Sequence, residues 1–171
     1  MKTLFLFILL VACIVVHAQL HLTVDTFNGD TTISTGYQAL NTHALGGKNA
    51  VTDSVIGVRV ISRKQSTYWL FFSFIPYDIP AANIRISNRN FAYIKTAKDY
   101  YYRIRYTGKT YTSSTNTKAN FYIDVTDYAA QLSRAVITNI NLETSVLYHS
   151  IQLQDTSQQT IANIINALLS Y

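Results

Sequence analysis

Residues 68–75 are Tyr68-Trp69-Leu70-Phe71-Phe72-Ser73-Phe74-Ile75, a run that is apolar on both faces of an extended chain. It is too short to cross a bilayer, because a membrane-spanning helix needs about 20 residues. Aromatic residues favour strands, and apolar side chains on both faces are typical of a strand that is covered on each side. Pro76 and Pro80 follow the run and end it. We therefore expect a central β-strand over residues 68–75.

The segments on either side alternate apolar and polar residues, as half-buried strands do. The strands expected from this pattern are residues 20–27, 31–34, 54–62, 84–86, 91–95, 99–106, 120–125, 135–142 and 145–153. Asn28-Gly29 separates the first two, and it predicts a hairpin because both central turn positions require positive φ. Residues 36–53 and 108–117 show little periodicity, which predicts loops.

The C-terminal segment changes to a helical period. Its apolar residues follow the spacing of one helix face: Ile161, Ile164, Ile165, Leu168 and Leu169. The opposite face bears no charge, so we expect this helix to pack onto the sheet, with Asp155, Thr156 or Ser157 as its N-cap. Residues 127–133 predict a second, short helix capped by Thr126 or Asp127.

These elements predict one mainly β (α+β) domain over residues 19–171. About eight to ten short strands with frequent turn signals favour an antiparallel β-sandwich or a small barrel over a parallel α/β sheet. The amphipathic helix adds a C-terminal α element to that architecture. Neither an internal repeat nor a low-complexity segment interrupts the chain.

The N-terminus has the pattern of a cleavable secretory signal peptide. Lys2 precedes an apolar run from Leu4 to Val16, and Val16-His17-Ala18 places small residues at the −3 and −1 positions of a cleavage site. We expect removal of residues 1–18, secretion, and no transmembrane segment afterwards. The sole cysteine, Cys13, would leave with that segment. A mature chain without thiols has no disulfide, no cysteine nucleophile and no cysteine-ligated zinc.

Catalytic and metal-binding motifs are weak. Three histidines lie beyond the signal peptide: His21 and His149 in expected strands, and His43 in the expected loop. None has a nucleophile motif beside it, and the sole glutamate, Glu143, falls in an expected turn. Two groups offer oxygen ligands: Asp25, Asn28 and Asp30, and Asp124 with Asp127. Turn formation and helix capping account for both groups. We therefore expect no enzyme activity, no cofactor and no metal.

The strongest functional pattern is a segment rich in tyrosine and basic residues. Eight of the fourteen Lys and Arg residues lie between Arg85 and Lys118, where Asp99 is the one acid. Seven of the thirteen tyrosines lie in or beside this segment: Tyr93, Tyr100, Tyr101, Tyr102, Tyr106, Tyr111 and Tyr122. Tyrosine presents a flat apolar ring with a hydroxyl at its edge, and clustered cations attract polyanions. The candidate ligand-binding residues are Lys95, Lys98, Tyr101, Arg103, Arg105, Lys109 and Tyr111.

The pattern predicts a secreted, non-catalytic binding module for an acidic glycan, another carbohydrate or an anionic surface. Nucleic acid is the less favoured polyanion in that compartment. The ordinary alternative for the segment is a solvated sheet face, because tyrosine suits strands and Lys or Arg keeps a sheet soluble. The alternative function is a self-associating subunit of an extracellular coat or matrix, joined through the uncharged helix face or the sheet edges.

Overall fold

The computed structural model describes residues 20–24, 29–45, 49–63, 65–76, 80–87, 89–112 and 118–171, and for residues 41–45, 49–52, 82 and 108–112 the main chain alone. The strands are β1 (Leu20–Val24), β2 (Thr31–Thr35), β3 (Gln38–Leu45), β4 (Asn49–Ser62), β5 (Gln65–Phe74), β6 (Phe91–Thr96), β7 (Tyr101–Thr112), β8 (Ala119–Asp124), β9 (Ile137–Glu143) and β10 (Tyr148–Gln152). The helical elements are η1 (Ala81–Asn83), η2 (Thr126–Tyr128), α2 (Ala129–Leu132) and α3 (Thr160–Leu169).

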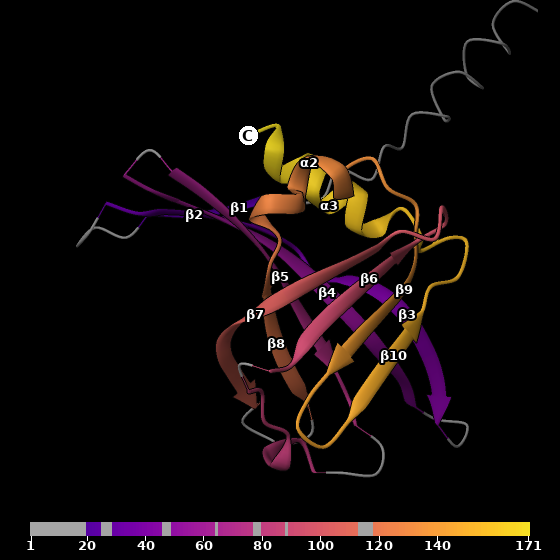
Figure 1. The fold of residues 1–171 in the computed structure, drawn as a ribbon. Helices are drawn as coiled ribbons and strands as arrows, with labels where there is room; N and C mark the ends of the chain where they lie inside the picture. Colours follow the sequence, from indigo (N-terminus) through magenta and orange to yellow (C-terminus); the bar gives the residue numbers. More distant parts are fainter. Residues whose placement is uncertain are drawn as a thin grey trace, which may run out of the picture.

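The strands form one antiparallel sheet in the order β1-β2-β4-β5-β8-β7-β6-β9-β10, and β3 pairs with the first part of β4. Strand β7 joins two halves of this sheet, because its first residues pair with β6 and its later residues with β8. The halves face each other across the core, where the His149 ring of β10 stacks on Phe74 of β5 with 4.0 Å between ring centroids. The mainly β fold with a C-terminal helix is confirmed (Figure 1).

The aromatic run at residues 68–75 does form a central strand. Strand β5 pairs with β4 on one side and β8 on the other. Its residues Leu70, Phe72 and Phe74 are buried in the core. On the opposite face Ser73 is buried, whereas Trp69 and Phe71 are of intermediate exposure, so the outer face is covered only in part. The outer rings gain partial cover from Tyr122 of β8, whose centroid lies 4.6 Å from that of Phe71.

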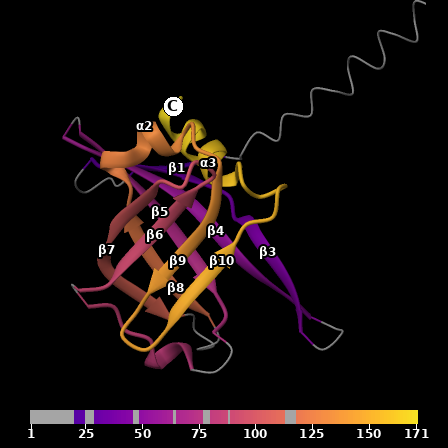
Figure 2. The same ribbon diagram turned by 45° about the vertical axis from the view of Figure 1, so that its right-hand side comes forward.

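Helix α3 lies beside α2 at one end of the folded sheet (Figure 2). It buries Ile161, Ile164, Ile165 and Leu168 against β2 and β4, which confirms that the helix packs on the sheet. Leu169 stays 40% exposed. The expected caps are wrong: Gln159 is the N-cap of α3 and makes no side-chain cap bond, because a turn over residues 155–159 precedes the helix.

The expected short helix is present as η2 followed by α2, but neither Thr126 nor Asp127 caps α2. Tyr128 is its N-cap. The Thr126 hydroxyl instead accepts a hydrogen bond from the Tyr68 main-chain N–H at 2.9 Å and donates to Asp124 Oδ1 at 2.6 Å. Thr126, which was expected to cap the helix, thus connects the helical segment to β5.

Several predicted loops and strands differ from the structure. Residues 38–45 and 49–53 are strand rather than loop, since the main chain of β3 pairs with β4 although its sequence is polar. Residues 108–112 extend β7, and residues 113–117 of that expected loop lie outside the described part. Residues 84–86 form no strand, because the Arg85 carbonyl accepts a hydrogen bond from Ser145 N–H at 3.0 Å instead of joining a ladder.

The first hairpin is confirmed, with β1 antiparallel to β2 and Gly29 at φ +75. The described part of its first strand is Leu20–Val24, and residues 25–28, which include Asn28 of the expected turn, lie outside the described residues. Strand β1 is not half-buried as expected: it lies at the edge of the sheet, where Leu22 and Val24 are each 52% exposed. The expected signal peptide lies outside the described residues, and none of the helices within them has the length and apolar character to cross a bilayer.

Candidate functional site

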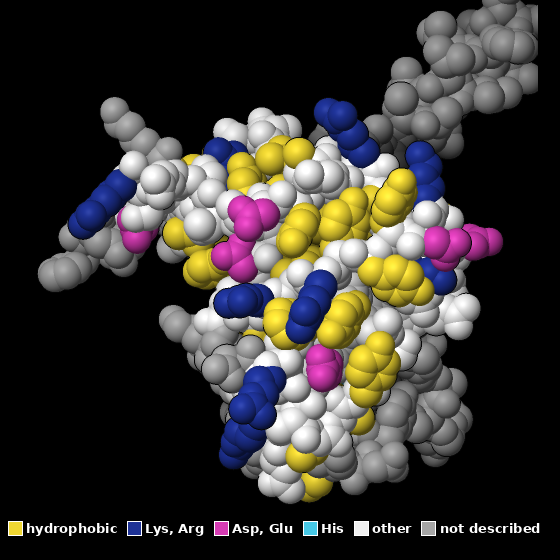
Figure 3. Space-filling view, viewed as in Figure 1, with side chains coloured by type: hydrophobic (Ala, Val, Ile, Leu, Met, Phe, Trp, Pro, Cys, Tyr) yellow, Lys and Arg dark blue, Asp and Glu magenta, His cyan; other side chains and the backbone are white. Residues whose placement is uncertain are grey.

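The outward side chains of β6, β7, β9 and β10 form one surface, which we call the aromatic–basic face. The strand registers bring together Phe91, Tyr93 and Lys95 from β6, Tyr101, Arg103 and Arg105 from β7, Asn141 and Glu143 from β9, and Tyr148 from β10. Alternation along β7 produces it, because Tyr102, Ile104 and Tyr106 turn into the core while their neighbours point outward. In the space-filling view, hydrophobic side chains gather on this side with Lys and Arg beside them (Figure 3).

Two of the three cations of this face are held over aromatic rings. Arg103 Cζ lies 3.5 Å from the centroid of Phe91, and Lys95 Nζ lies 5.5 Å from that of Tyr101. Lys95 also pairs with Asp99 at 3.0 Å. The hydrogen bond with Asp99, followed by the one with Tyr101, raises the pKa of Lys95. Lys95 is thus partly neutralised by an internal partner, which leaves Arg103 and Arg105 as the main charge for an external ligand.

Arg103 and Arg105 are both exposed. Neither forms an ion pair with any residue that the structure describes. Exposed guanidinium groups present several N–H donors in a fixed plane, which suits carboxylate, sulfate and phosphate groups. The two side chains therefore supply positive charge at the part of the face where β7 pairs with β6.

A hollow of about 310 Å³ lies within the face. Its lining comes from three strands and the start of a fourth: Tyr93, Tyr101, Asn141, Glu143 and Tyr148. Tyr101 and Tyr148 are 60% and 58% exposed, so their rings form open walls. The Phe91 N–H donates to Glu143 Oε2 at 3.3 Å, which holds that carboxylate at the edge of the hollow. Flat rings beside an amide and a carboxylate match the apolar faces and hydroxyl groups of a sugar ring.

No family model, curated protein or solved structure matches this chain.

The structure brings together four of the seven predicted ligand-binding residues, namely Lys95, Tyr101, Arg103 and Arg105. Lys98 lies apart from them, in the turn between β6 and β7, where it lines a different pocket. Lys109 and Tyr111 belong to β7, but their side chains lie outside the described part.

Four residues of the face, Phe91, Asn141, Glu143 and Tyr148, were not among the predicted ligand-binding residues. Glu143 was assigned to a turn, although it is the last residue of β9. Alternation of Asn139 and Asn141 with Ile140 and Leu142 did signal an outward polar row. The sequence does not show which strand lies beside that row, because β9 pairs with β6 across a long separation in the chain.

Of the three histidines, His149 is packed inside the fold. His149 Nε2 lies 3.4 Å from Asp53 Oδ1, and both side chains are largely buried, at 14% and 3% exposure. His21 is exposed on β1, and His43 belongs to β3 instead of the predicted loop, with its side chain outside the described set. The described residues include no group of three His, Cys, Asp or Glu suited to a metal ion. Asp25 and Asn28 lie outside that set, and Asp124 Oδ1 accepts the Thr126 N–H at 2.9 Å.

Proposed function

We propose that the protein is a non-catalytic binding module that holds an acidic glycan on its aromatic–basic face. The observation that supports this most is the placement of three tyrosines around one hollow, with Arg103 directly across from Tyr93 in the β6–β7 register. Tyrosine rings stack on the apolar faces of sugars, and the two arginines attract carboxylate or sulfate groups along the chain. A surface with both features recognises a charged saccharide better than either feature alone.

The test of charge placement is retention of the purified protein on immobilised heparin, a sulfated glycan. Arg103→Ser with Arg105→Ser should elute at lower salt than the unmodified protein, because each lost contact with a sulfate or carboxylate group reduces counterion release. The matched control is Arg63→Ser with Lys118→Ser, which removes the same charge from exposed residues outside the face. If both double variants elute at the same salt concentration, retention reflects net charge alone and the proposal fails.

The test of the hollow is affinity for a defined acidic oligosaccharide. Tyr101→Ala and Tyr148→Ala should each weaken binding roughly three- to tenfold, since each removes one stacking ring. Tyr37→Ala removes another exposed tyrosine, 67% exposed, that lies outside the face and serves as the control. Equal affinities for all three variants would exclude the hollow as the sugar site.

A second candidate, a self-associating structural subunit, has one observation in its favour. Within the described residues β1 pairs on one side only, and its sequence LHLTV contains neither a charge nor a proline. Edge strands without such features pair readily with another chain. Leu22→Lys should abolish association measured by sedimentation at several concentrations, and a monomer at every concentration would exclude this function.

A further inference from the structure

A second hollow, of about 290 Å³, lies between the β6–β7 turn and α2. Its polar lining comes from Lys98, Gln131 and Arg134, and Ala97, Tyr102 and Val136 contribute to an apolar wall that makes up most of the surface. Pockets for small molecules span roughly 300–1,000 Å³, so this volume suits a single ring with its substituents. The residues come from three elements that only the folded chain brings together.

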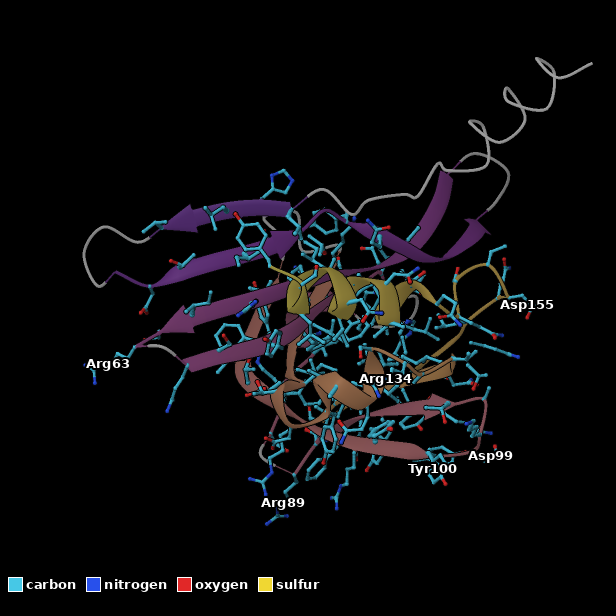
Figure 4. All side chains as sticks on the ribbon, turned by 90° about the horizontal axis from the view of Figure 1, so that it is seen from above. Arg63, Arg89, Asp99, Tyr100, Arg134 and Asp155 are labelled. Atoms are coloured by element: carbon cyan, nitrogen blue, oxygen red, sulfur yellow. The ribbon has the colours of Figure 1, made fainter. Side chains whose placement is uncertain are left out.

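The two cations of this pocket are available to a ligand. Lys98 and Arg134 are exposed, and neither pairs with a carboxylate anywhere in the described ranges. Asp99, the acid next to Lys98, is occupied by Lys95 at 3.0 Å on the aromatic–basic face. Viewed from above, Arg134 and Tyr100 lie on the same side of the molecule, and Arg63 lies far from both (Figure 4). The pocket thus combines an apolar wall with two cations that lack an internal counter-charge.

The walls are held in place by internal contacts. The Ala97 N–H donates to the Val136 carbonyl at 2.8 Å, which fixes the β6–β7 turn against the segment after α2. Tyr102 packs on Tyr128 with 5.3 Å between ring centroids. Asn166 of α3 donates to the Ser133 carbonyl at 2.8 Å and anchors the end of α2. A pocket that exists before binding spends little free energy on ordering its walls.

We propose that this pocket binds one acidic sugar residue, with its carboxylate or sulfate between Lys98 and Arg134 and its ring against the apolar wall. The inference rests on the proposed function and extends it. Tyr101 lines the first hollow, whereas its neighbours Tyr100 and Tyr102 line the second. Because Tyr101 and Tyr102 point to opposite sides of β7, a glycan chain would reach both hollows by passing around the β6–β7 turn. The acidic unit belongs in the second hollow, because the first contains the Glu143 carboxylate.

The experiment is an NMR titration of the ¹⁵N-labelled protein with glucuronic acid, with glucose and sodium sulfate as separate probes. Glucuronic acid should shift the amides of Ala97, Gln131 and Val136. Glucose should bind at least roughly tenfold more weakly, because it lacks the charge that Lys98 and Arg134 recognise. Sulfate alone should shift the same amides only at higher concentration, since it has no ring for the apolar wall. Equal affinities for glucuronic acid and glucose would overturn the proposal.

The variants separate the pocket from general charge. Lys98→Gln and Arg134→Gln should each weaken glucuronic acid binding roughly tenfold, the effect of losing a hydrogen bond to a charged group. Arg63→Gln, a distant exposed arginine, should leave it unchanged. Thermal unfolding of the variants checks that they fold. Unchanged affinity in both pocket variants would overturn the assignment.

The pocket and the proposed function fail in different ways. Retention on heparin that depends on Arg103 and Arg105, without any shift at Ala97, Gln131 and Val136 in glucuronic acid, would overturn the pocket alone. Binding of glucuronic acid in the pocket, together with heparin retention that ignores Arg103 and Arg105, would overturn the aromatic–basic face and leave the pocket in place.

Discussion

Two regions of the molecule arise from alternation along strands: the sheet surface under α3, and the aromatic–basic face. They differ in what covers them. Under α3, the helix contacts β2 and β4, and it approaches β4 so closely that Gly57 has no room for a Cβ. On the aromatic–basic face, Tyr101 stays 60% exposed and its neighbours touch mainly one another. The first region therefore stabilises the fold. The second can change its side chains at small cost to stability, which is what a binding surface requires.

The largest effect is expected at Gly57, where β4 passes beneath α3. A Cβ there would lie 2.2 Å from Ile164 Cγ2 and 2.9 Å from Leu168 Cδ1, closer than atoms can approach without movement. Gly57→Ala should lower the free energy of unfolding by about 1–3 kcal/mol, the usual cost of overpacking. Chemical denaturation measures it.

Two further variants sharpen that result. Gly36→Ala meets nothing within 4 Å and should change stability by less than about 1 kcal/mol. Ile164→Ala removes the methyl group that the new Cβ would strike, so its cost and that of Gly57→Ala should be less than additive. Strict additivity would show that the close approach of α3 does not cause the loss.

Arg59 should give the next largest loss of stability. Its Nη1 donates to the Leu168 carbonyl at 2.9 Å, near the end of α3, and its Cζ lies 5.5 Å from the Tyr68 centroid. Positive charge at a helix C-terminus is favourable, and the carbonyl loses its partner when the guanidinium is removed. Arg59→Gln should cost about 1–2 kcal/mol in denaturant unfolding. A loss indistinguishable from zero would mean that water replaces the contact.

Tyr106 should make stability depend on alkaline pH. Burial of its phenol, together with the charge of Glu143, raises the pKa of Tyr106 in the folded protein. The unfolded chain loses this proton above about pH 10, whereas the folded chain retains it, so stability falls as pH rises beyond that point. The slope contributed by one such group is at most about 1.4 kcal/mol per pH unit.

Tyr106→Phe should remove that slope from denaturation curves collected between pH 9 and pH 11. Tyr101→Phe takes an exposed phenol from the same strand and is the control. If the slope persists unchanged in Tyr106→Phe, another group causes the alkaline loss, and the contrast between the inner and outer sides of β7 disappears.

The sequence predicted those elements whose own residues show a recognisable hydrophobic pattern. Residues 99–106 and 120–125 were predicted because alternate burial leaves a local pattern, residues 68–75 because they form an uninterrupted apolar and aromatic run, and the C-terminal helix because its stripe repeats at helical spacing. Strand β3 was missed because its polar residues are held by main-chain bonds to β4, and main-chain bonds leave no trace in composition. Strand β1 was given a buried face because alternation does not reveal that a strand lies at an edge.

The candidate site was predicted only for residues of β7 and for Lys95 of the neighbouring β6, which lie close together in the sequence. Tyr101, Arg103 and Arg105 share a face by alternation, which needs no knowledge of neighbours. Tyr148 lies beside Glu143 through the local pairing of β10 with β9, but both enter the hollow only through the pairing of β9 with β6, and such long-range pairing cannot be deduced from period or composition. Arg134 gave no signal for the same reason, because the pocket with Lys98 exists only once α2 packs beside the β6–β7 turn.

The smallest effect on stability is expected at Arg103, which has the same type of contact as Arg59. Both guanidinium groups lie over an aromatic ring, but Arg103 is exposed and bonds to no helix carbonyl. Arg103→Gln should cost less than about 1 kcal/mol, the usual range of an exposed cation–π pair. Denaturant unfolding measures this cost, as for Arg59→Gln. The same variant should also elute from heparin at lower salt. If the two substitutions cost the same, the aromatic–basic face contributes to the fold as the α3 contact does, and its arginines are retained for stability and not for a ligand.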